Sequence, residues 1–393
     1  MIPLAEAQRR LIALAKPVST ESVPLIEANG RWLAADIVAK RTQPARDLSA
    51  MDGYAVRASP ERRSWQVVGE SAAGKPFTGQ VNAGEAVRIF TGAALPFGCD
   101  SICIQENISR REDVITLLED VLLPQAGRHV RASGSDFAEG ETLITAGTRM
   151  TPAKIALAAM GGHGSAQLRR PIRIAIISTG DELVTPGADT DDDHIPATNA
   201  LMIAAMLSGW PVEINDIGIV ADTLDLLSNA FKVAVNADII VTSGGASVGD
   251  HDLVRPALLA AGASLDFWKI AMRPGKPLMA GQLGDSLVLG LPGNPVSAFV
   301  TAILFLKPAI AALSAAAETL PRSYTAMLGA PMPAVSARTD HIRARLHKNR
   351  LFPVGIDDSA ALKGLASADA LIVRTAHAPP ANIDDFAIYI PLA

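Results

Sequence analysis

The sequence predicts a multidomain α/β protein. It has a central three-layer domain with a parallel sheet, an N-terminal helical and β region, and a small C-terminal β-barrel-like domain. Three observations indicate this class. The chain has 393 residues, which at about 150 residues per domain favours more than one domain. Hydrophobic residues make up 49% and charged residues 19%, so a sizeable core is possible. Strand-like and helix-like runs alternate mid-chain, as they do in βαβ units.

The N-terminal region is expected to form a helical linker subdomain from residues 1–46 and 142–170. Apolar residues spaced three and four apart over residues 4–16 predict an amphipathic helix. A proline at the first helical position and a terminal glycine predict a second helix over 151–162. Between the two linker parts, residues 47–141 contain short apolar runs separated by Gly and Pro turns, which predict a small β subdomain.

The predicted α/β domain covers residues 171–318, and short strands after it predict a second β domain over 319–393. The strand candidates of the α/β domain are residues 172–178, 214–220, 237–242, 267–272 and 287–291. Its helix candidates are residues 200–207, 223–235, 254–261 and 296–313. Helices between successive strands are expected to cover both faces of the sheet.

Charge and cysteine content exclude several classes of protein. The chain has 35 Lys and Arg against 40 Asp and Glu, and its net charge of -5 gives no electrostatic footprint for nucleic acid. Cys99 and Cys103 are too few for a disulfide scaffold or a structural zinc site, and they favour packed thiols in a reducing cytoplasm. There is no signal-peptide pattern and no uninterrupted apolar run of about 18 residues, so we expect a cytoplasmic protein without a membrane partner.

Three turns after predicted strands are candidate binding segments, because ligands of doubly wound sheets bind beyond the carboxyl ends of the strands. Residues 178–182 combine hydroxyls, a glycine and two carboxylates. Residues 242–249 are rich in glycine, which lets backbone N–H groups converge on an anion. Residues 291–297 lead into a long helix, whose free N–H groups also favour anions. Together the three turns predict an anion site.

Charged side chains near these turns fit the same chemistry. Lys269, Arg273 and Lys276 are candidates to neutralise a phosphate or oxyanion, with a solvated loop as the alternative interpretation. Carboxylates combined with phosphate oxygens are the ligands that Mg²⁺ prefers. The candidate carboxylates are Asp52, Asp136, Glu182, Asp222, Asp250 and Asp252. The acidic run 189–194 is expected to be a solvated connection.

Other enzyme chemistries lack their motifs. The sequence has no G-x-G-x-x-G after the first strand of the α/β domain, which argues against a nicotinamide enzyme. Its seven histidines are scattered, which argues against a histidine-based zinc site. The residues alone therefore predict an anion-binding α/β enzyme compatible with Mg²⁺.

The run Ser49-Ala50-Met51-Asp52-Gly53-Tyr54-Ala55 resembles the signature of the molybdopterin molybdotransferase family, to which the E domain of gephyrin is also similar. Further blocks resemble the family in the family's order and extend the resemblance over about residues 1 to 390. They are Arg88-Ile89-Phe90-Thr91-Gly92-Ala93, Arg131 with Gly134 and Asp136, residues 178–183, Thr198-Asn199, 243–249, Arg273-Pro274-Gly275-Lys276-Pro277 and 291–297.

The resemblance implies an elongated homodimer with four subdomains per chain, one of which resembles the fold of the molybdopterin adenylyltransferases. Members of the family take adenylylated molybdopterin and molybdate, insert the metal between the dithiolene sulfurs and release AMP with the help of Mg²⁺. The implied protein partners are the molybdopterin adenylyltransferase and molybdoenzyme apoproteins. Molybdate is thus expected as a substrate and Mg²⁺ as the cofactor.

The resemblance also implies roles for individual residues by matching position. Catalytic roles are implied for Asp52, Asp136, Glu182, Asp222 and Asp252, of which the last three are the implied Mg²⁺ ligands. Substrate-binding roles are implied for Thr91, Arg131, Thr179, Gly180, Asn199, Ser243, Gly244, Gly245, Ser247, Lys269, Arg273, Lys276, Pro292, Gly293, Asn294 and Pro295. No catalytic role is expected for Ser359, because residues 355–359 differ from the family's Gln- and Ser-rich turn.

Two alternatives remain beside the transferase. The adenylyltransferase of the same pathway consists of a single α/β domain, which leaves residues 1–170 and 320–393 unexplained. A dimeric scaffold of the gephyrin type needs no catalytic groups, whereas the acidic and basic candidates are all present here. For Asp52 and Glu182 we expect roles in the reaction and not in the fold, with the two residues approaching one ligand from different subdomains.

Overall fold

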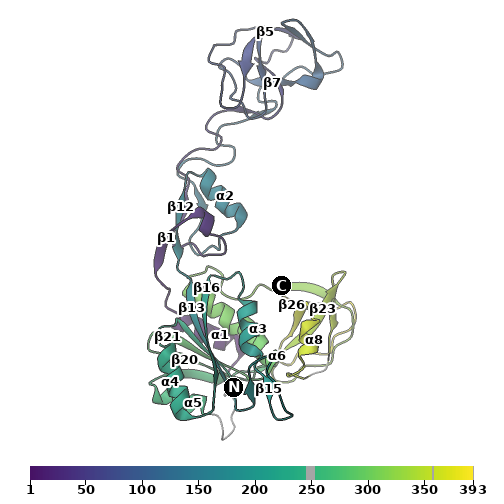
Figure 1. Cartoon of the computed structure of the whole chain (residues 1–393). Coiled ribbons are helices and arrows are strands. Elements are labelled where there is room, and N and C mark those ends of the chain that lie inside the picture. Colours follow the sequence, from purple (N-terminus) through teal and green to yellow (C-terminus); the bar gives the residue numbers. More distant parts are fainter. Residues whose placement is uncertain (245–252, 356–357, 393) are drawn as a thin grey trace.

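The computed structural model describes residues 1–244, 253–355 and 358–392 and shows an elongated molecule (Figure 1). A small β head lies at one end, a narrow rod connects it to the rest, and a wide base combines the α/β domain with a C-terminal barrel. We call residues 47–141 the head. The flanking segments 20–46 and 142–169 form the rod, so the head is an insertion within it. Four predicted site residues, Gly245, Ser247, Asp250 and Asp252, lie outside the described residues.

The α/β domain contains a six-stranded sheet in the order β16-β13-β17-β21-β20-β18. The first four strands are parallel, and the last two run antiparallel to their neighbours. The strands are β13 (Ile172–Thr179), β16 (Val212–Val220), β17 (Ile239–Ser243), β18 (Ser264–Lys269), β20 (Pro277–Leu283) and β21 (Ser286–Leu291). The central strands are buried almost throughout, as their continuous apolar runs require when helices cover both faces.

Helices on both faces make this domain three-layered. Alternate residues of β13 enter two separate cores: Ile174 and Ile176 pack on one face of the sheet, and Ala175 and Ile177 on the other. The first face is covered by α1 (Leu4–Leu14), α3 (Asn199–Met206), α6 (Pro295–Thr301), η3 (Ala302–Leu306) and α7 (Lys307–Leu313). The second face is covered by α4 (Leu224–Ala234) and α5 (Val254–Ala260).

The first helix lies in a different body from the one that the sequence predicted. Helix α1 was expected in the linker subdomain, but its apolar stripe packs on α7 and β20 of the α/β domain. Ala7 and Leu11 are fully buried there. The 3.6-residue period predicts that such a stripe is covered, and it does not specify by which body.

The run Pro295–Leu313 has the length and apolarity to cross a membrane, and 89% of its most apolar window is buried inside the domain. A scan for uninterrupted apolar sequence misses this run because Lys307 interrupts it. Its burial is that of a core helix, which covers the first face of the sheet.

The rod is a small α/β unit with its own core. Its elements are β1 (Thr20–Pro24), η1 (Leu25–Glu27), β2 (Ile37–Val38), β11 (Thr142–Ile144), α2 (Pro152–Met160) and β12 (Ser165–Arg169). Strand β1 pairs with β12, and β2 pairs with β11, so the rod is built from two distant parts of the chain. The Thr151 side chain caps α2 by accepting from the N–H of Lys154, as predicted.

The head is a six-stranded sheet in the order β7-β4-β6-β5-β9-β8. Its elements are β3 (Leu48–Ser49), β4 (Gly53–Val56), β5 (Ser64–Ser71), β6 (Glu85–Ile89), β7 (Ser101–Ile104), η2 (Gln105–Asn107), β8 (Ile108–Arg111), β9 (Val114–Leu117) and β10 (Val130–Arg131). A Cβ at Gly53 would lie 2.0 Å from the carbonyl oxygen of Cys103, so only glycine fits there. Cys99 and Cys103 are unpaired thiols, and burial raises their pKa to about 12 and about 11.

The C-terminal domain is a closed five-stranded barrel, because β23 pairs with both β24 and β25. Its elements are β22 (Tyr324–Leu328), β23 (Thr339–His347), β24 (Arg350–Pro353), α8 (Leu362–Ala366), β25 (Ala370–Arg374) and β26 (Phe386–Pro391). The short strand β19 (Met272–Arg273) leaves the α/β domain and pairs with β23. The short strands β14 (Leu183–Val184) and β15 (Ile195–Pro196) pair with each other in parallel. Barrel and α/β domain therefore share backbone pairing.

Candidate functional site

Asp52 of the head is held as an ionised carboxylate. It lies in the turn between β3 and β4, where one carboxylate oxygen accepts from the backbone N–H of Thr91 at 2.7 Å and from the Thr91 hydroxyl at 2.8 Å. These two donors, the backbone one first, hold the pKa of Asp52 below its ordinary value. The predicted partners Arg131 and Asp136 lie in the same body and are exposed.

The carboxyl ends of the parallel strands bring a second set of predicted residues together. We call Thr179, Glu182, Asn199, Asp222 and Ser243 the sheet-edge group. The Thr179 hydroxyl donates to Asp222, whose own N–H donates to Asp181 at 3.2 Å. The Asn199 amide donates to the Ser243 hydroxyl at 2.8 Å and to the Gly293 carbonyl at 2.7 Å. Three strand ends and one helix start thus meet at one place, as expected of a doubly wound sheet.

Glycine is required at two positions of this edge. Gly244 has a φ of +100°, and a Cβ there would lie 2.0 Å from the Thr179 carbonyl oxygen. Gly180 has a φ of +148°, and a Cβ there would lie 2.6 Å from the carboxylate of Glu182. Glycine therefore lets these two turns pack closely against Thr179 and Glu182.

One atom of the sheet-edge group has no partner among the described residues. The Oδ1 oxygen of Asn199 is buried and accepts no hydrogen bond from them, although its amide nitrogen makes two. Buried acceptors are nearly always satisfied in folded proteins, so this oxygen is positioned to accept from a ligand N–H.

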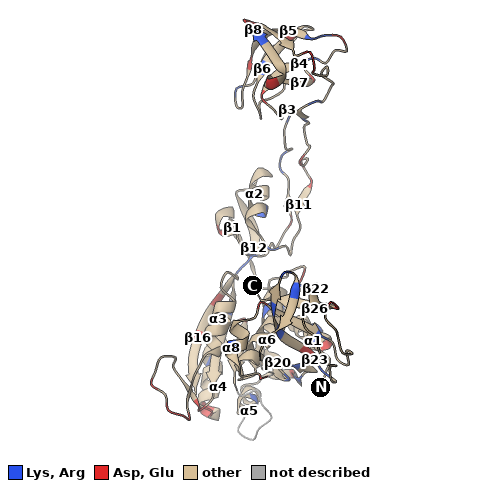
Figure 2. Ribbon diagram, turned by 90° about the vertical axis from the view of Figure 1, so that its right-hand side faces the viewer, with Lys and Arg blue, Asp and Glu red and all other residues tan. Residues whose placement is uncertain are grey.

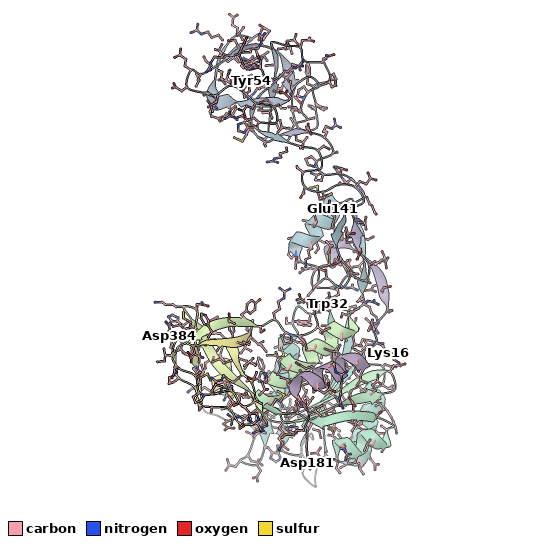
Figure 3. The ribbon with its side chains drawn as sticks, turned by 180° about the vertical axis from the view of Figure 1, so that it is seen from behind. Lys16, Trp32, Tyr54, Glu141, Asp181 and Asp384 are labelled. Carbon is pink, nitrogen blue, oxygen red and sulfur yellow. The ribbon has the colours of Figure 1, made fainter. Side chains whose placement is uncertain are left out.

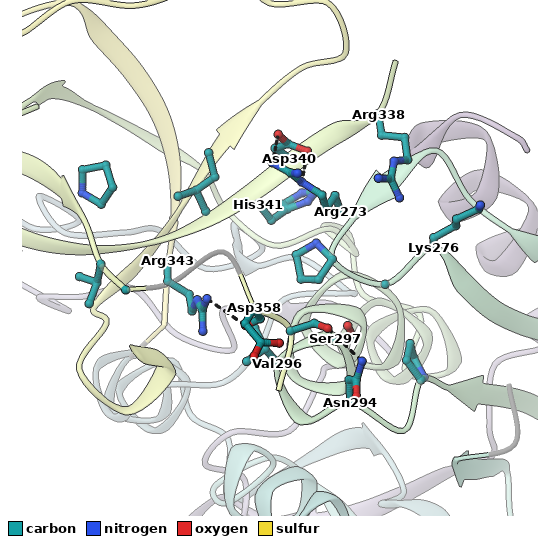
Figure 4. A pocket seen from close by; sticks show the side chains of 18 of the residues that line it. Arg273, Lys276, Asn294, Val296, Ser297, Arg338, Asp340, His341, Arg343 and Asp358 are labelled. Atoms are coloured by element: carbon teal, nitrogen blue, oxygen red, sulfur yellow. Dashed lines mark hydrogen bonds and ion pairs between the residues drawn. The ribbon is translucent and has the colours of Figure 1, made fainter. Parts of the chain in front are cut away.

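A cavity of about 480 Å³ lies between the α/β domain and the barrel, and we call it the anion cavity (Figure 4). Its cationic lining residues are Arg273, Lys276, Arg338 and Arg343. Arg343 donates to the backbone carbonyls of Ala361 at 2.8 Å and Asp358 at 3.1 Å.

The structure changes the role predicted for Arg273. Its guanidinium makes a two-pronged contact with Asp340 of the barrel, at 3.1 and 3.0 Å. Asp340 is only 5% exposed, so this pair joins the two domains and compensates a buried charge. Lys276 is exposed at the cavity and carries the anion-binding role better. Lys269 does not line the described cavity wall.

The turn at residues 292–294 connects the sheet-edge group to the anion cavity. The carbonyl of Gly293 accepts from Asn199, and the Asn294 amide donates to the Ser359 hydroxyl at 2.9 Å. Pro292, Asn294 and Ser359 all line the cavity. Ser359, for which no catalytic role was predicted, therefore lies at the cavity wall.

Asp52 is far from these groups within one chain. Figure 3 shows Tyr54 of the head and Asp181 of the sheet edge at opposite ends of the molecule. The rod separates them, so a single chain does not bring Asp52 and Glu182 to one ligand.

Within the described part of the chain, no three His, Cys, Asp or Glu side chains gather closely enough to hold a metal ion. Glu182 and Asp222 are on the sheet edge, and Asp252 lies outside the described residues. Oxygen donors are nevertheless the right chemistry for Mg²⁺, which keeps several waters and uses one or two protein carboxylates beside substrate phosphates. The sheet edge fits that limited requirement.

Sequence reasoning missed the barrel's share of the cavity. Asp340, His341 and Arg343 lie on β23 and are buried, although all three are polar. Buried polar residues in a strand of alternating pattern are a usable signal, but the sequence TDHIRARLH also reads as a solvated edge strand. These three side chains are buried where another domain packs against the barrel.

The fold and these groups define a multidomain α/β protein with a polar sheet edge next to a cationic cavity. Family models agree along the chain: "MoeA N-terminal region (domain I and II)" matches residues 2–162, "Probable molybdopterin binding domain" matches 175–312, and "MoeA C-terminal region (domain IV)" matches 325–382. The chain belongs to the molybdopterin molybdenumtransferase family.

Two curated relatives and one solved structure illustrate the likeness. A molybdopterin molybdenumtransferase of Haemophilus influenzae is 38% identical over 318 residues, 80% of this chain and 78% of the relative. One of Bacillus subtilis is 33% identical over 385 residues, 95% of this chain and 90% of the relative. The crystal structure of the molybdopterin biosynthesis moeA protein from Pyrococcus horikoshii superposes with a TM-score of 0.84 at 25% identity, covering 100% of both chains.

Proposed function

We propose that this chain inserts molybdate into adenylylated molybdopterin and releases AMP, which completes the molybdenum cofactor. The observation that carries this proposal is the turn at residues 292–294, which is hydrogen-bonded to Asn199 of the sheet-edge group and also lines the anion cavity. A nucleotide-linked pterin and a tetrahedral oxyanion can therefore bind side by side. The relatives' name, molybdopterin molybdenumtransferase, describes the same chemistry.

The sheet-edge group is suited to the pterin and its phosphates. The Oδ1 of Asn199, which accepts no hydrogen bond from the described residues, would accept from a pterin N–H. The anion cavity is suited to molybdate, because Lys276, Arg338 and Arg343 offer cationic N–H donors to a dianion. Binding both substrates at adjacent positions contributes catalysis by proximity.

Glu182 and Asp222 are the described residues that would hold Mg²⁺ at this edge, together with phosphate oxygens of the substrate. Bound there, Mg²⁺ would neutralise charge as AMP departs. The Thr179 hydroxyl donates to Asp222 and fixes the orientation of that carboxylate.

The reaction site also requires a second copy of the chain, and we include a homodimer in the proposal. Asp52 is ionised and poised by Thr91, yet it lies at the far end of its own chain from the sheet edge. A partner's head can deliver it. Sedimentation of a single 41.0 kDa species at micromolar concentration would overturn this part.

Mixing inactive variants tests the shared site directly. Asp52→Ala alters only the head, and Asp222→Ala alters only the base. In a mixed dimer one site carries both changes and the other carries neither. Random exchange of subunits should therefore restore roughly a quarter of the wild-type activity. No recovery from a mixture shown to contain mixed dimers would contradict the shared site.

Release of AMP from adenylylated molybdopterin and molybdate by the purified chain tests the activity itself. An adenylyltransferase would instead consume ATP and release pyrophosphate, and a scaffold would release neither product. Absence of molybdate-dependent AMP release from a folded dimer would overturn the transferase proposal. A cytoplasmic location and contacts with the adenylyltransferase and molybdoenzyme apoproteins belong to the same proposal, since the product must pass directly to its user.

A further inference from the structure

His341 is a buried histidine whose ring is poorly satisfied by the described residues. The residue is 4% exposed, and neither Nδ1 nor Nε2 makes a hydrogen bond of good geometry to them, although the backbone of Arg273 lies near enough to interact with the ring. Because nearly all buried polar side-chain atoms in proteins are paired, each exception needs an explanation. At least one ring nitrogen is therefore left for a ligand that reaches the ring.

The ring lines the anion cavity. His341 and Arg343 are two residues apart on β23, so both side chains project from the same face of the strand. Figure 4 shows His341 beside Arg273 and Asp340, at the wall where the barrel meets the α/β domain. Much of the remaining wall cannot donate hydrogen bonds, because it consists of Pro292, Val296, Pro331, Met332, Pro333 and Pro353.

Charge around the ring favours an anion. The α/β domain contributes Arg273 and Lys276, and the barrel contributes Arg338 and Arg343. The carboxylates on the wall are Asp340, which Arg273 neutralises, and Asp358. On the neighbouring strand β25, Arg374 is opposite Asp340 and donates to the carbonyls of Pro333 and Pro379. The cavity wall as a whole therefore carries four cationic side chains and two carboxylates.

In the empty cavity the imidazole is neutral. Burial lowers the pKa of His341 to about 4, and the nearby backbone of Arg273 opposes this shift only partly. A neutral imidazole has one N–H donor and one acceptor nitrogen. An entering dianion would reverse the balance, since a negative charge beside the ring favours the protonated form.

We propose that His341 binds the oxyanion substrate in this cavity and takes up one proton from solvent as the dianion enters. The proton adds to the free ring nitrogen, no other bond forms or breaks, and the resulting imidazolium donates to an oxygen of the anion. This inference rests on the proposed function, which identifies the anion as molybdate. Its physical consequence is that anion affinity rises as the pH falls.

The test is calorimetric titration of the full-length wild-type chain with sodium molybdate and, separately, with sodium sulfate. Each titration is run in two buffers of different ionisation enthalpy between about pH 5 and 8, the range in which imidazole titrates. We expect net proton uptake and an affinity that increases by up to about tenfold per pH unit as the pH falls. Sulfate stays a dianion over this whole pH range, so proton uptake measured with sulfate cannot come from protonation of the ligand.

Three variants test whether His341 is the group that takes up the proton. His341→Gln keeps a polar side chain that does not titrate, and it should bind with no uptake and a flat pH profile. His341→Phe keeps an aromatic ring but has no ring nitrogen, and it should weaken binding roughly tenfold or more. His347→Gln alters an exposed histidine on the same strand and should match the wild type in uptake, affinity and AMP release. Melting temperatures establish that each variant is folded.

The outcomes separate this inference from the function on which it rests. Anion binding by the wild type without proton uptake, or uptake that persists in folded His341→Gln, would overturn the role of His341 and leave the transferase intact. Molybdate-dependent AMP release without anion binding at this cavity would also overturn it. Absence of AMP release would instead count against the proposed function.

Discussion

Asp52 and Thr91 form a pair whose effect on the reaction can be separated from any effect on the fold. Asp52→Ala should lower AMP release about a hundredfold, comparable to the loss of one preorganised electrostatic contact. The melting temperature should change by only about one or two degrees, because the residue is on the surface. Single-turnover AMP release and a thermal melt on the same sample check both. Full activity, or lost activity with a collapsed melt, would remove Asp52 from the site.

Thr91→Val predicts a pH effect with a definite sign. The Thr91 hydroxyl and N–H lower the pKa of Asp52, and the substitution removes only the hydroxyl. The pKa of Asp52 should therefore rise, and the acid limb of the rate profile should move to higher pH. Thr116→Val alters a head hydroxyl that faces Ser64 and serves as the control. If the acid limb of the pH–rate profile does not move in Thr91→Val, Asp52 does not have to be ionised for the reaction.

Arg273 and Lys276 are three residues apart and should respond differently to substitution by alanine. Arg273→Ala leaves Asp340 buried without its partner, which should cost about 2 to 4 kcal/mol of unfolding free energy; the half-exposed guanidinium keeps the figure below that of a fully buried pair. Lys276→Ala should leave stability within about 0.5 kcal/mol and weaken molybdate binding by about 1 to 3 kcal/mol. Urea unfolding and calorimetry distinguish the two, and equal effects on stability would contradict the division of roles.

At the scale of elements, Asp238 connects three segments at the amino end of the sheet. It precedes β17 and accepts from the guanidinium of Arg170 at 2.7 Å through both oxygens, and from the N–H of Arg173 at 2.8 Å. Burial alone would raise the pKa of Asp238, but these hydrogen bonds outweigh it and lower the pKa below the ordinary value. The contact holds the exit of the rod against the first strand of the sheet.

Asp238→Asn should therefore reduce the unfolding free energy by about 1 to 3 kcal/mol at neutral pH. Because the folded pKa is depressed, the contribution is complete above the unfolded value and is lost as the pH falls through the folded value. Urea unfolding over a pH series checks this. Asp285→Asn removes an almost fully exposed partner of Lys16 and should change nothing. A wild-type and variant difference that grows on acidification would contradict the assigned sign.

Local patterns predicted which elements form but not how all of them pair. The apolar run of β13 and the caps of α2 are properties of neighbouring residues, so the sequence contained them. Strand β20 was not among the predicted strands, and the antiparallel direction of β18 was not predicted either, because a buried apolar run carries no information on strand direction. The sheet-edge turns were predicted since strand ends meet by topology, whereas His341 and Arg343 reach the site only through docking of a separate domain.

At the scale of the molecule, Arg149 fixes the rod on the base. Its guanidinium packs against two neighbouring indoles, 5.2 Å from the ring centre of Trp32 and 4.9 Å from that of Trp210. It also donates to the carbonyls of Gly30 and Gly209, each at 2.7 Å. Trp32 and Gly30 belong to the rod, and Trp210 and Gly209 to the α/β domain, so one side chain connects both bodies.

Arg149→Ala should loosen this junction. We expect a broadened distance distribution between spin labels on the rod and the base, and reduced AMP release if the rod must hold the head in place for a partner. The lost contacts are worth about 1 to 3 kcal/mol. Arg111→Ala alters an exposed arginine of the head, so it should leave the distribution unchanged. An equally narrow distance distribution in Arg149→Ala would show that the strands of the rod alone set the angle between the rod and the base.

Figure 2 shows that two neighbouring segments of the chain connect the head to the rest of the molecule. Its entry and exit are clamped by pairing of β3 with β10. Residues 130–131 thus pair with residues 48–49 inside the head. The rod then closes outside this pairing, where Pro24 pairs with Ser165. The head shortens the loop that the rod must close, which reduces the entropy lost in pairing β1 with β12.

This order has a consequence for synthesis on the ribosome. Helix α1 is made first, yet its buried face packs on α7 and β20, which emerge hundreds of residues later. At about 5 to 20 residues per second, the stripe of Ala7 and Leu11 stays uncovered for roughly 15 to 60 seconds. During that interval the head and rod can already be complete. The nascent chain therefore presents an apolar amphipathic helix to chaperones throughout most of its translation, and the base closes over it last.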